Sequence, residues 1–276
     1  MLAALLALGA SASWGVGDFL GGVKSRTLHP LAIMVVSQSV GLSVLAVWVA
    51  ARATAPPGAS VAWAPLSALF GTVALAAFYR GMAVGAVTIV APIAGAGAVI
   101  PVVVGLATGD HPSAAQGAGF AAAVVGVVLS SWDRAPGRSR WAAGAGFGVV
   151  AMLGFGFYFV FLHLASSGDY LWPAFLFRVS SVSLVLVALL VSRPALGPIA
   201  GAWLALGVIG VLDTGGNTLY AASSLHGSVS VTAVLASLYP VVTVLLARYH
   251  LRERVHRVQE LGIGLTIAGI VLVSAG

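Results

Sequence analysis

The sequence predicts an all-α polytopic membrane protein of ten transmembrane helices, built from two inverted five-helix repeats. Of its 276 residues, 60% are hydrophobic and only 7% are charged, whereas about a quarter of residues are charged in soluble domains. Apolar runs of about 20 residues, long enough to cross a bilayer, recur along the whole chain. The second half also repeats residues of the first in the same order. These observations require a lipid environment and a duplicated helical unit.

The duplication joins a stretch from Tyr79 to Gly126 with a stretch from Tyr220 to Gly269. From an acidic residue onward the offset is constant, since 253−110 and 269−126 both give 143. Self-similarity of this kind indicates a repeated structural unit. The matched residues, in chain order, are Gly85 with Gly227, Pro101 with Pro240, Asp110 with Glu253, Gln116 with Gln259, and Gly119 with Gly262.

The apolar runs place ten helices, because backbone groups in lipid must be hydrogen-bonded within a helix. Residues 10–12 of the first run resemble a signal-peptide cleavage site, but the run lacks a basic start. Its Gly15 and Gly17 are echoed by Gly154 and Gly156, so we assign it as a retained helix. In chain order, the helices lie near residues 2–22, 30–51, 62–84, 86–107, 113–132, 142–166, 171–191, 199–222, 227–247 and 258–274.

The domain organisation follows from one polar linker between the copies, residues 133–140, which contains Pro136 and Gly137. Residues 1–132 form the first five-helix repeat, and residues 141–276 form the second. Because each repeat has an odd number of helices, the second enters the membrane from the opposite side. A pseudo-twofold axis in the membrane plane is therefore predicted to relate the repeats, as in many secondary transporters.

Positive charge is concentrated on one side of the predicted bundle. Of the thirteen Lys and Arg, only Arg52 lies at an even-numbered loop, and ten lie at odd-numbered loops. Because Lys and Arg gather on the cytoplasmic side, the odd loops are predicted to be cytoplasmic and both termini external. The net charge of +6 thus reflects topology, and no nucleic-acid partner is indicated. The ten are Lys24, Arg26, Arg134, Arg138, Arg140, Arg193, Arg248, Arg252, Arg254 and Arg257.

Several short patterns occur in the same order in the two halves. A glycine-rich first helix carries Trp14-Gly15, a later helix in each half carries a proline, and a short turn then contains Asp110 or Glu253. Gln-x-x-Gly follows, beginning at residue 116 or 259. This set resembles the EamA-like family of the drug/metabolite transporter superfamily, which usually has Glu where Asp110 stands. The resemblance implies export of amino acids, related metabolites or drugs, and cytoplasmic termini, the reverse of what the charges predict.

Few ionisable side chains fall within the predicted helices, where each costs at least about 2.5–3.5 kcal/mol. Asp18 and Arg80 share a level near the odd-loop ends of their helices, whereas Arg178 and Asp213 share a level toward the even-loop ends. We therefore predict two ion pairs, Asp18 with Arg80 and Asp213 with Arg178. Either these pairs open and close during transport, or an Asp exchanges a proton with the substrate, or the pairs only orient the helices.

Other side chains are candidates for the substrate pathway. Asn217 lies one turn after Asp213 on the same helical face, and it could equally be a satisfied interhelical amide, as could Gln38. His163 could couple transport to protons, because its unperturbed pKa is about 6.5, or it could be an interfacial histidine. Several aromatic residues fall in the helices that would line the central cavity if the chain follows the resembled family. They would suit an amphipathic solute, although aromatic residues also fill ordinary bundle cores. They are Trp14, Tyr79, Phe155, Phe157, Tyr158, Tyr220 and Tyr239.

Three prolines are predicted hinge points. Pro92, Pro101 and Pro240 remove hydrogen bonds in the fourth and ninth predicted helices, and the freed carbonyls are tolerated only against protein or a wet cavity. A simple packing kink is the alternative. Small-residue spacings such as Gly17 to Gly21 let helices approach closely, either within one chain or between chains.

Several classes of function are not indicated. The single lysine, Lys24, has no phosphate-binding loop and is not in a late helix, so neither a nucleotide site nor a retinal Schiff base is predicted. Cysteine is absent, and the histidines show no metal-ligand spacing. We therefore predict that the chain is not an enzyme and binds no cofactor or metal.

The sequence thus predicts a secondary transporter, multi-pass in a bacterial-type plasma membrane. It would export or exchange small organic metabolites, such as amino acids or drug-like solutes, by alternating access. Energy would come from the substrate gradient or from protons, and the partners would be the small-molecule substrate and the lipid bilayer. The alternative is a non-transporting membrane scaffold or a passive channel, for which saturable counterflow is not expected.

Overall fold

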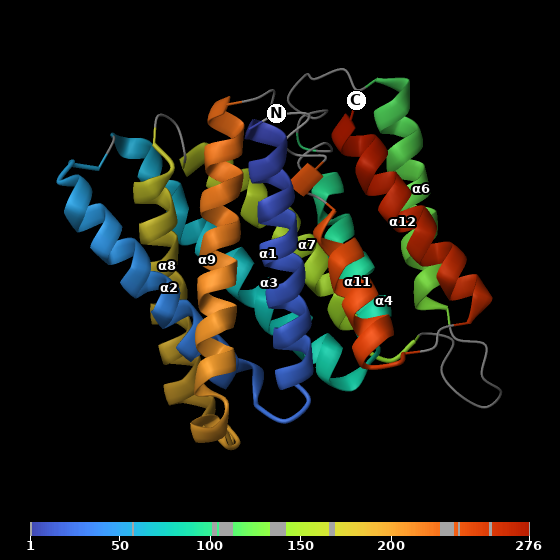
Figure 1. Ribbon diagram of the computed structural model, residues 1–276, viewed down its shortest axis with the longest axis horizontal. Coiled ribbons are helices and arrows are strands. Elements are labelled where there is room, and N and C mark those ends of the chain that lie inside the picture. Colours follow the sequence, from blue (N-terminus) through green and yellow to red (C-terminus); the bar gives the residue numbers. More distant parts are fainter. Residues whose placement is uncertain are drawn as a thin grey trace.

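The described residues of the protein form a bundle of α-helices, shown as a computed structural model in Figure 1. The structure describes residues 2–56, 58–100, 104, 113–132, 142–165, 169–226, 235–236, 238–253 and 256–275. Within these ranges there is no β-strand. The α-helices are α1 (Leu2–Lys24), α2 (Pro30–Arg52), α3 (Ala64–Val84), α4 (Val87–Gly95), α6 (Ala114–Ser131), α7 (Ala145–Ala165), α8 (Leu171–Ser192), α9 (Trp203–His226), α11 (Tyr239–His250) and α12 (Arg257–Ala275).

Each of the ten predicted runs contains one of these helices, so the predicted all-α architecture is confirmed. Five described spans are long and apolar enough to cross a membrane: Leu2–Lys24, Pro30–Arg52, Ala59–Val84, Ala145–Leu162 and Leu171–Ser192. The apolar part of α6 is shorter, Ala114–Ser130. Spanning length is thus shown for half of the predicted segments.

Three helices depart most from the predicted boundaries. In the described residues, α11 begins at Tyr239 and ends at His250, whereas the predicted run covers residues 227–247. Helix α4 ends at Gly95 and continues as the 3₁₀-helix η2 (Ala96–Ala98). The Ala96 N–H donates to the Ile93 and Ala94 carbonyls as well as to the Pro92 carbonyl, and these shorter spacings close tighter turns than an α-helix does. Helix α9 continues to His226, four residues beyond the predicted end. The predicted linker, residues 133–140, lies outside the described residues.

The main contacts between helices of different halves occur in matching pairs. Helix α1 packs against α9 and α11, and α7 packs against α3 and α4. Likewise, α2 packs against α9 while α8 packs against α3. Three further contacts join helices of equal rank in the two halves, namely α2 with α8, α4 with α11, and α6 with α12, the pair at one side of Figure 1. Exchanging the two halves in chain order therefore reproduces this set of contacts.

Helices α6 and α12 approach each other through glycines at corresponding positions. A side chain on Gly126 would overlap Thr266 and Gly262, and a side chain on Gly269 would overlap Ala123 and Gly119. The second set of residues is the first set with the halves exchanged at the offset of 143 (269−126, 266−123, 262−119). Residue numbers rise along one helix as they fall along the other, so the two helices are antiparallel. Only glycine allows backbones this close.

The largest apolar core lies at the end of the bundle that carries the α1–α2 and α3–α4 turns, here called the odd-loop end. It contains Met34 near the start of α2, Phe78 and Met82 near the end of α3, Val87 at the start of α4, and Leu206 near the start of α9. Toward the opposite, even-loop end, a smaller core joins α2 to α8 through Leu45, Val49 and Leu171. The start of α1 and the end of α12 both lie at the even-loop end (Figure 1).

The glycine contact gives a stability prediction. Gly126→Ala and Gly269→Ala should each lower the free energy of unfolding by about 1–3 kcal/mol, because the added methyl group overpacks a backbone contact. The matched controls are Gly117→Ala in α6 and Gly264→Ala in α12, since a side chain at either position meets open space. Thermal unfolding in detergent measures the difference. Equal melting temperatures for test and control variants would contradict the contact.

Candidate functional site

A buried arginine joins three helices near the middle of the bundle. Arg178 of α8 is 2% exposed, and its guanidinium donates hydrogen bonds to Gln38 of α2 and to the carboxylate of Asp213 on α9. The predicted ion pair between Asp213 and Arg178 is therefore present. A buried guanidinium has several donors to satisfy, and the Gln38 oxygen supplies a second acceptor. Sequence reasoning had considered Gln38 as a candidate without linking it to Arg178.

A glycine makes room for this arrangement. A side chain on Gly41 of α2 would overlap the hydroxyl of Thr214 and come within 3.3 Å of Arg178 Nε. Gly41 therefore lets α2 approach α9 and gives the arginine its space. The Thr214 hydroxyl is buried and makes no hydrogen bond within the described part of the chain.

Polar and aromatic contacts hold α8 in place around the arginine. Thr72 of α3 donates a hydrogen bond to Ser181 of α8 at 2.9 Å, and both side chains are buried. The Arg178 guanidinium carbon lies 5.5 Å from the centre of the Phe177 ring. Tyr158 of α7 packs edge-on against the same ring, with centroids 5.2 Å apart. Helices α3, α7 and α8 thus form one wall around the buried cation.

The predicted ion pair between Asp18 and Arg80 is wrong. Among the described residues these two form no ion pair, and the Arg80 side chain is exposed. The neighbouring residue Tyr79, 2% exposed, takes the inner position instead, because a side chain on Gly21 of α1 would overlap the Tyr79 ring. Successive residues on a helix point about 100° apart, so two residues at the same level need not face each other.

Arg80 acts on the α1–α2 turn instead. His29 caps the start of α2 by accepting a hydrogen bond from the Leu31 N–H at 3.3 Å. Partial burial lowers the pKa of His29, and the positive charge of Arg80 lowers this pKa further. Arg80 is thus a charge of the odd-loop end and is not part of the buried site.

Asp18 faces the interior without a partner. It is half-buried, and within the described residues no hydrogen bond or ion pair involves it. Its charge interacts with three residues on the helices packed against α1, namely Tyr79 of α3, Asp213 of α9 and Tyr239 of α11. None of these residues carries a positive charge. The Asp18 carboxylate therefore remains uncompensated by its neighbours.

The predicted aromatic residues divide into separate groups. Trp14 packs against Tyr220 and Tyr239 with ring centroids 5.9 and 6.2 Å apart. Its indole lies over Gly216 of α9, where any side chain would collide with it. By contrast, Phe155 packs on Phe78 and joins the core of the odd-loop end. Phe157 packs on Phe70 and is 36% exposed, so it lies away from Trp14.

The remaining predicted residues have different outcomes. Asn217 is half-buried and makes no hydrogen bond to a described residue, so its amide is available on the wall formed by α9. Pro92 lies inside α4 as predicted. Pro240 lies in the first turn of α11, where a missing N–H costs little, so the expected loss of a helix-interior hydrogen bond is wrong for this residue. Pro101 and the His163 side chain lie outside the described part of the chain.

Glu253 fastens the odd-loop end. Its carboxylate accepts hydrogen bonds from the Val87 N–H at 3.2 Å and from the Thr88 N–H and hydroxyl, both at 3.0 Å. It also pairs with Arg26 of the α1–α2 turn. A carboxylate at a helix N-terminus satisfies free N–H groups and the helix dipole. The acid of the repeated motif therefore caps α4 from the loop between α11 and α12, a role that sequence reasoning missed.

A second ion pair lies at the even-loop end. Arg52, at the end of α2, pairs with Asp169 at 2.9 Å, and the aspartate side chain is 6% exposed. Asp169 also accepts the Leu171 N–H at 2.6 Å at the start of α8. The Trp172 indole N–H donates to the Thr54 carbonyl at 3.0 Å. These contacts join α2 to α8 only, whereas Glu253 connects the α11–α12 loop to the α1–α2 turn and to the α3–α4 turn.

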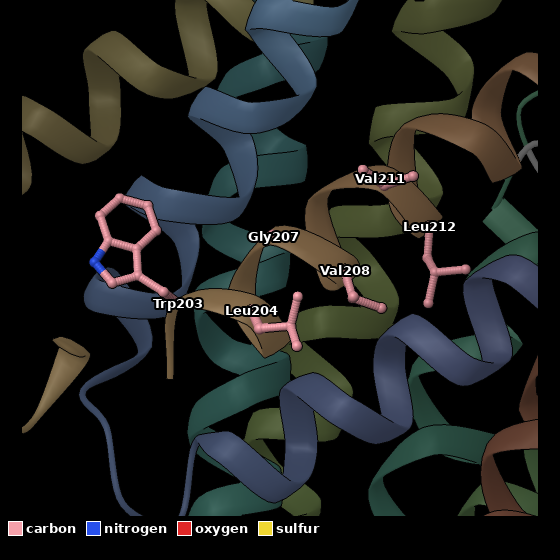
Figure 2. Close-up of a pocket in the computed structure, with 6 residues that line it drawn as sticks. All are labelled: Trp203, Leu204, Gly207, Val208, Val211 and Leu212. Carbon is pink, nitrogen blue, oxygen red and sulfur yellow. The ribbon is translucent and has the colours of Figure 1, made fainter. Parts of the chain in front are cut away.

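The groove in Figure 2 lies on the outer face of α9 and is apolar. It is lined by Trp203, Leu204, Gly207, Val208, Val211 and Leu212. Leu204 is 84% exposed and Trp203 is 60% exposed, as expected for a surface that contacts lipid. None of the predicted site residues lines it. The groove is therefore separate from the charged cluster.

Comparison with known proteins identifies the family. Residues 142–275, which contain α7 to α12, match the EamA-like transporter family. The second half of the chain belongs to this family. The resemblance inferred from the sequence motifs is thus confirmed over residues 142–275, and this match together with the apolar helices indicates an integral membrane protein.

The fold also has a solved counterpart. A structure described only as "Crystal structure of protein" aligns with a TM-score of 0.66 and 17% identity, over 98% of this chain and 95% of that chain. At this identity the likeness concerns the fold alone. A search of curated proteins finds no match to the sequence.

Breaking the central ion pair should be costly. Arg178→Met should lower the free energy of unfolding by up to about 3 kcal/mol, because it leaves Asp213 without its counter-ion; a fully buried pair would cost about 3–5 kcal/mol, but Asp213 is 34% exposed. The double variant Arg178→Met with Asp213→Leu should recover part of this loss. Arg248→Met is the control, since it breaks an exposed pair with Glu260 worth only about 0–1 kcal/mol. Thermal unfolding in detergent measures all three, and a double variant no better than the single would contradict the pairing.

Removing the Glu253 cap should loosen the start of α4. Glu253→Ala removes acceptors from two backbone N–H groups, and the loss of a helix cap costs about 0.5–2 kcal/mol. The Val87 and Thr88 amides should therefore exchange with deuterium faster, as measured by mass spectrometry. Glu260→Ala is the control, because Glu260 is exposed in α12. Unchanged protection of the α4 amides would rule out the cap.

Proposed function

We propose that this EamA-like protein is a secondary transporter that carries small organic solutes by alternating access. The site would lie between α1, α2, α8 and α9. The observation that carries the proposal is the accessibility of charged groups at mid-depth. Asp213 is 34% exposed although its partner Arg178 is 2% exposed, and Asp213 lies ten residues (213−203) into α9, or about 15 Å at 1.5 Å per residue.

An accessible carboxylate at this depth favours a hollow inside the bundle. A charged group facing lipid is costly, so ionisable residues within membrane helices usually face the bundle interior or a watery cavity. Asp18 on α1 and Asn217 and Tyr220 on α9, the helix that carries Asp213, are also half-buried. These side chains would line a solvent-filled space where a solute binds, with Trp14 and Tyr239 beside it.

The two halves would be inverted repeats, residues 1–132 and 141–276, joined by residues 133–140. Support comes from the helix contacts that are reproduced when the halves are exchanged, and from the reciprocal glycine contacts of α6 and α12. In inverted-repeat transporters, each half can adopt the arrangement of the other, which moves access from one side to the other. Pro92, Pro101 and Pro240 would absorb part of this change.

The described arrangement corresponds to closure at the odd-loop end. The main core and the Glu253 contacts with Arg26 and α4 all lie there. Opening toward that end would require Glu253 to release Arg26 and the α4 N-terminus together. The solute would then be exported or exchanged across the plasma membrane, driven by its own gradient or by protons. His163, Asp18 and Asp213 are the candidates for proton coupling.

Counterflow tests this function. Purified protein in liposomes preloaded with unlabelled phenylalanine or 2-phenylethylamine should accumulate the labelled compound transiently and with saturation. Asp213→Asn should lower the initial rate about tenfold or more, corresponding to roughly 1.4 kcal/mol, because the site loses a charge. Glu260→Gln should leave the rate unchanged, since Glu260 pairs only with an exposed arginine. Folding is checked by thermal unfolding of each variant.

Two outcomes would contradict the proposal. Linear, non-saturable flux of both compounds would indicate a passive channel, and no flux with folded protein would indicate a non-transporting scaffold. A normal rate in folded Asp213→Asn would remove Asp213 from the transport cycle.

A further inference from the structure

We propose that Asp18 binds the ammonium group of an organic cation, so that the solutes of this transporter are amphipathic amines. The inference rests on the proposed transport function for its physiological meaning, although the binding site can be tested by itself. Its basis is the charge balance inside the bundle, the position of Asp18 on α1, and the aromatic side chains one turn away.

When Asp18 is ionised, the interior of the described bundle has an excess negative charge. Two carboxylates, Asp18 and Asp213, face it, but only one cation, Arg178, is buried there. Arg178 already binds Asp213 and Gln38. An unpaired charge in a membrane interior requires a counter-ion. Asp18 is therefore the place where a mobile cation would complete the balance.

The burial of Arg178 also favours one class of solute. At 2% exposure, its guanidinium is closed off from a solute, and its charge is compensated by Asp213. A carboxylate-bearing solute would find no free cation at the site among the described residues. An anion or a zwitterion would therefore be bound less well than a simple amine of the same shape.

The face of α1 that carries Asp18 points into the bundle. Residues three or four positions away lie on the same helical face. Gly15 meets Val242 of α11, Gly21 meets Tyr79 of α3, and Gly22 meets Met82 of α3. Asp18 lies between these contacts and is nevertheless half-buried rather than fully buried. Asp18 therefore faces α3, α9 and α11 rather than lipid.

An aromatic wall stands beside the carboxylate. Trp14 is one turn before Asp18, and its ring packs against Tyr220 and Tyr239. A cation held over aromatic faces is attracted by their electron density, with a gain of about 0.5–2 kcal/mol. The same rings provide apolar surface for the rest of an amphipathic molecule. The carboxylate and the aromatic rings together match an ammonium group attached to a hydrophobic body.

A proton would compete with the amine for Asp18. The titratable or charged groups facing Asp18 are Tyr79 on α3, Asp213 on α9 and Tyr239 on α11. The negative charge of Asp213 favours any cation at Asp18, whether a proton or an ammonium group. The two cannot occupy the carboxylate together. Binding of an amine to protonated Asp18 would release one proton to the same side of the membrane, and binding should weaken as the pH falls.

Calorimetric binding to the full-length protein in detergent tests this inference. Four probes share a phenyl ring on a short chain and differ in their polar groups: the cation 2-phenylethylamine, the neutral 2-phenylethanol, the anion 3-phenylpropanoate and the zwitterion phenylalanine. The amine should bind at least about tenfold more tightly than the others, a difference of roughly 1.4 kcal/mol. Asp18→Asn should abolish this preference, and Asp18→Glu should retain it. The matched control Glu260→Gln should bind like the unmodified protein.

The unmodified protein supplies a second measurement that does not depend on a folded variant. Amine affinity should fall as the pH is lowered, and titrations in buffers of different ionisation enthalpy should show proton release on binding. The neutral 2-phenylethanol should show neither effect.

The outcomes separate the binding site from the proposed transport function. Equal binding of the four probes, tighter binding of the anion or zwitterion, or amine binding independent of pH would overturn the inference, even if counterflow of phenylalanine succeeds. Amine binding that requires Asp18, together with no counterflow of any probe, would leave the site standing and would refute transport.

Discussion

The arrangement at the centre of the bundle depends on one buried cation. Arg178 is the one fully buried charged residue in the described part of the chain, and it must find acceptors because no water reaches it. Gln38 and Asp213 provide them from two other helices, and Gly41 provides the space. Since Gln38 comes from the first half and Asp213 from the second, the interaction also joins the halves. It commits Arg178 to Asp213 and leaves Asp18 without a counter-ion.

The odd-loop end depends on a different kind of charge. Glu253 satisfies free N–H groups of α4 and binds Arg26, so three loops meet on one carboxylate. This carboxylate is 11% exposed, which strengthens its hydrogen bonds relative to a solvated ion pair. The apolar core around Met34, Phe78 and Leu206 lies at the same end. Tight packing here and accessible charges near mid-depth are the two observations that support the proposed closure at this end.

The features set by lipid were predictable from the sequence. Helix number and type follow from apolar length, because a run of about 20 apolar residues that crosses a bilayer forms a helix. The family could be inferred because motifs with fixed spacing survive in both halves. The pairing of Asp213 with Arg178 was also predictable, since depth can be counted at 1.5 Å per residue and two opposite charges at one depth attract each other.

Sequence by itself therefore determined the environment, the number of helices and the depth of each charge, because these depend on hydropathy and on counting along a helix. Only the tertiary structure decided which side chains face each other. Asp18 and Arg80 share a level, yet Tyr79 occupies the place beside α1 because Gly21 admits its ring there. The hydrogen bond from Arg178 to Gln38, and the bonds from the α4 N–H groups to Glu253, likewise depend on how the helices are rotated and packed. Rotation is set by contacts between distant small residues, and no local pattern along one helix encodes it.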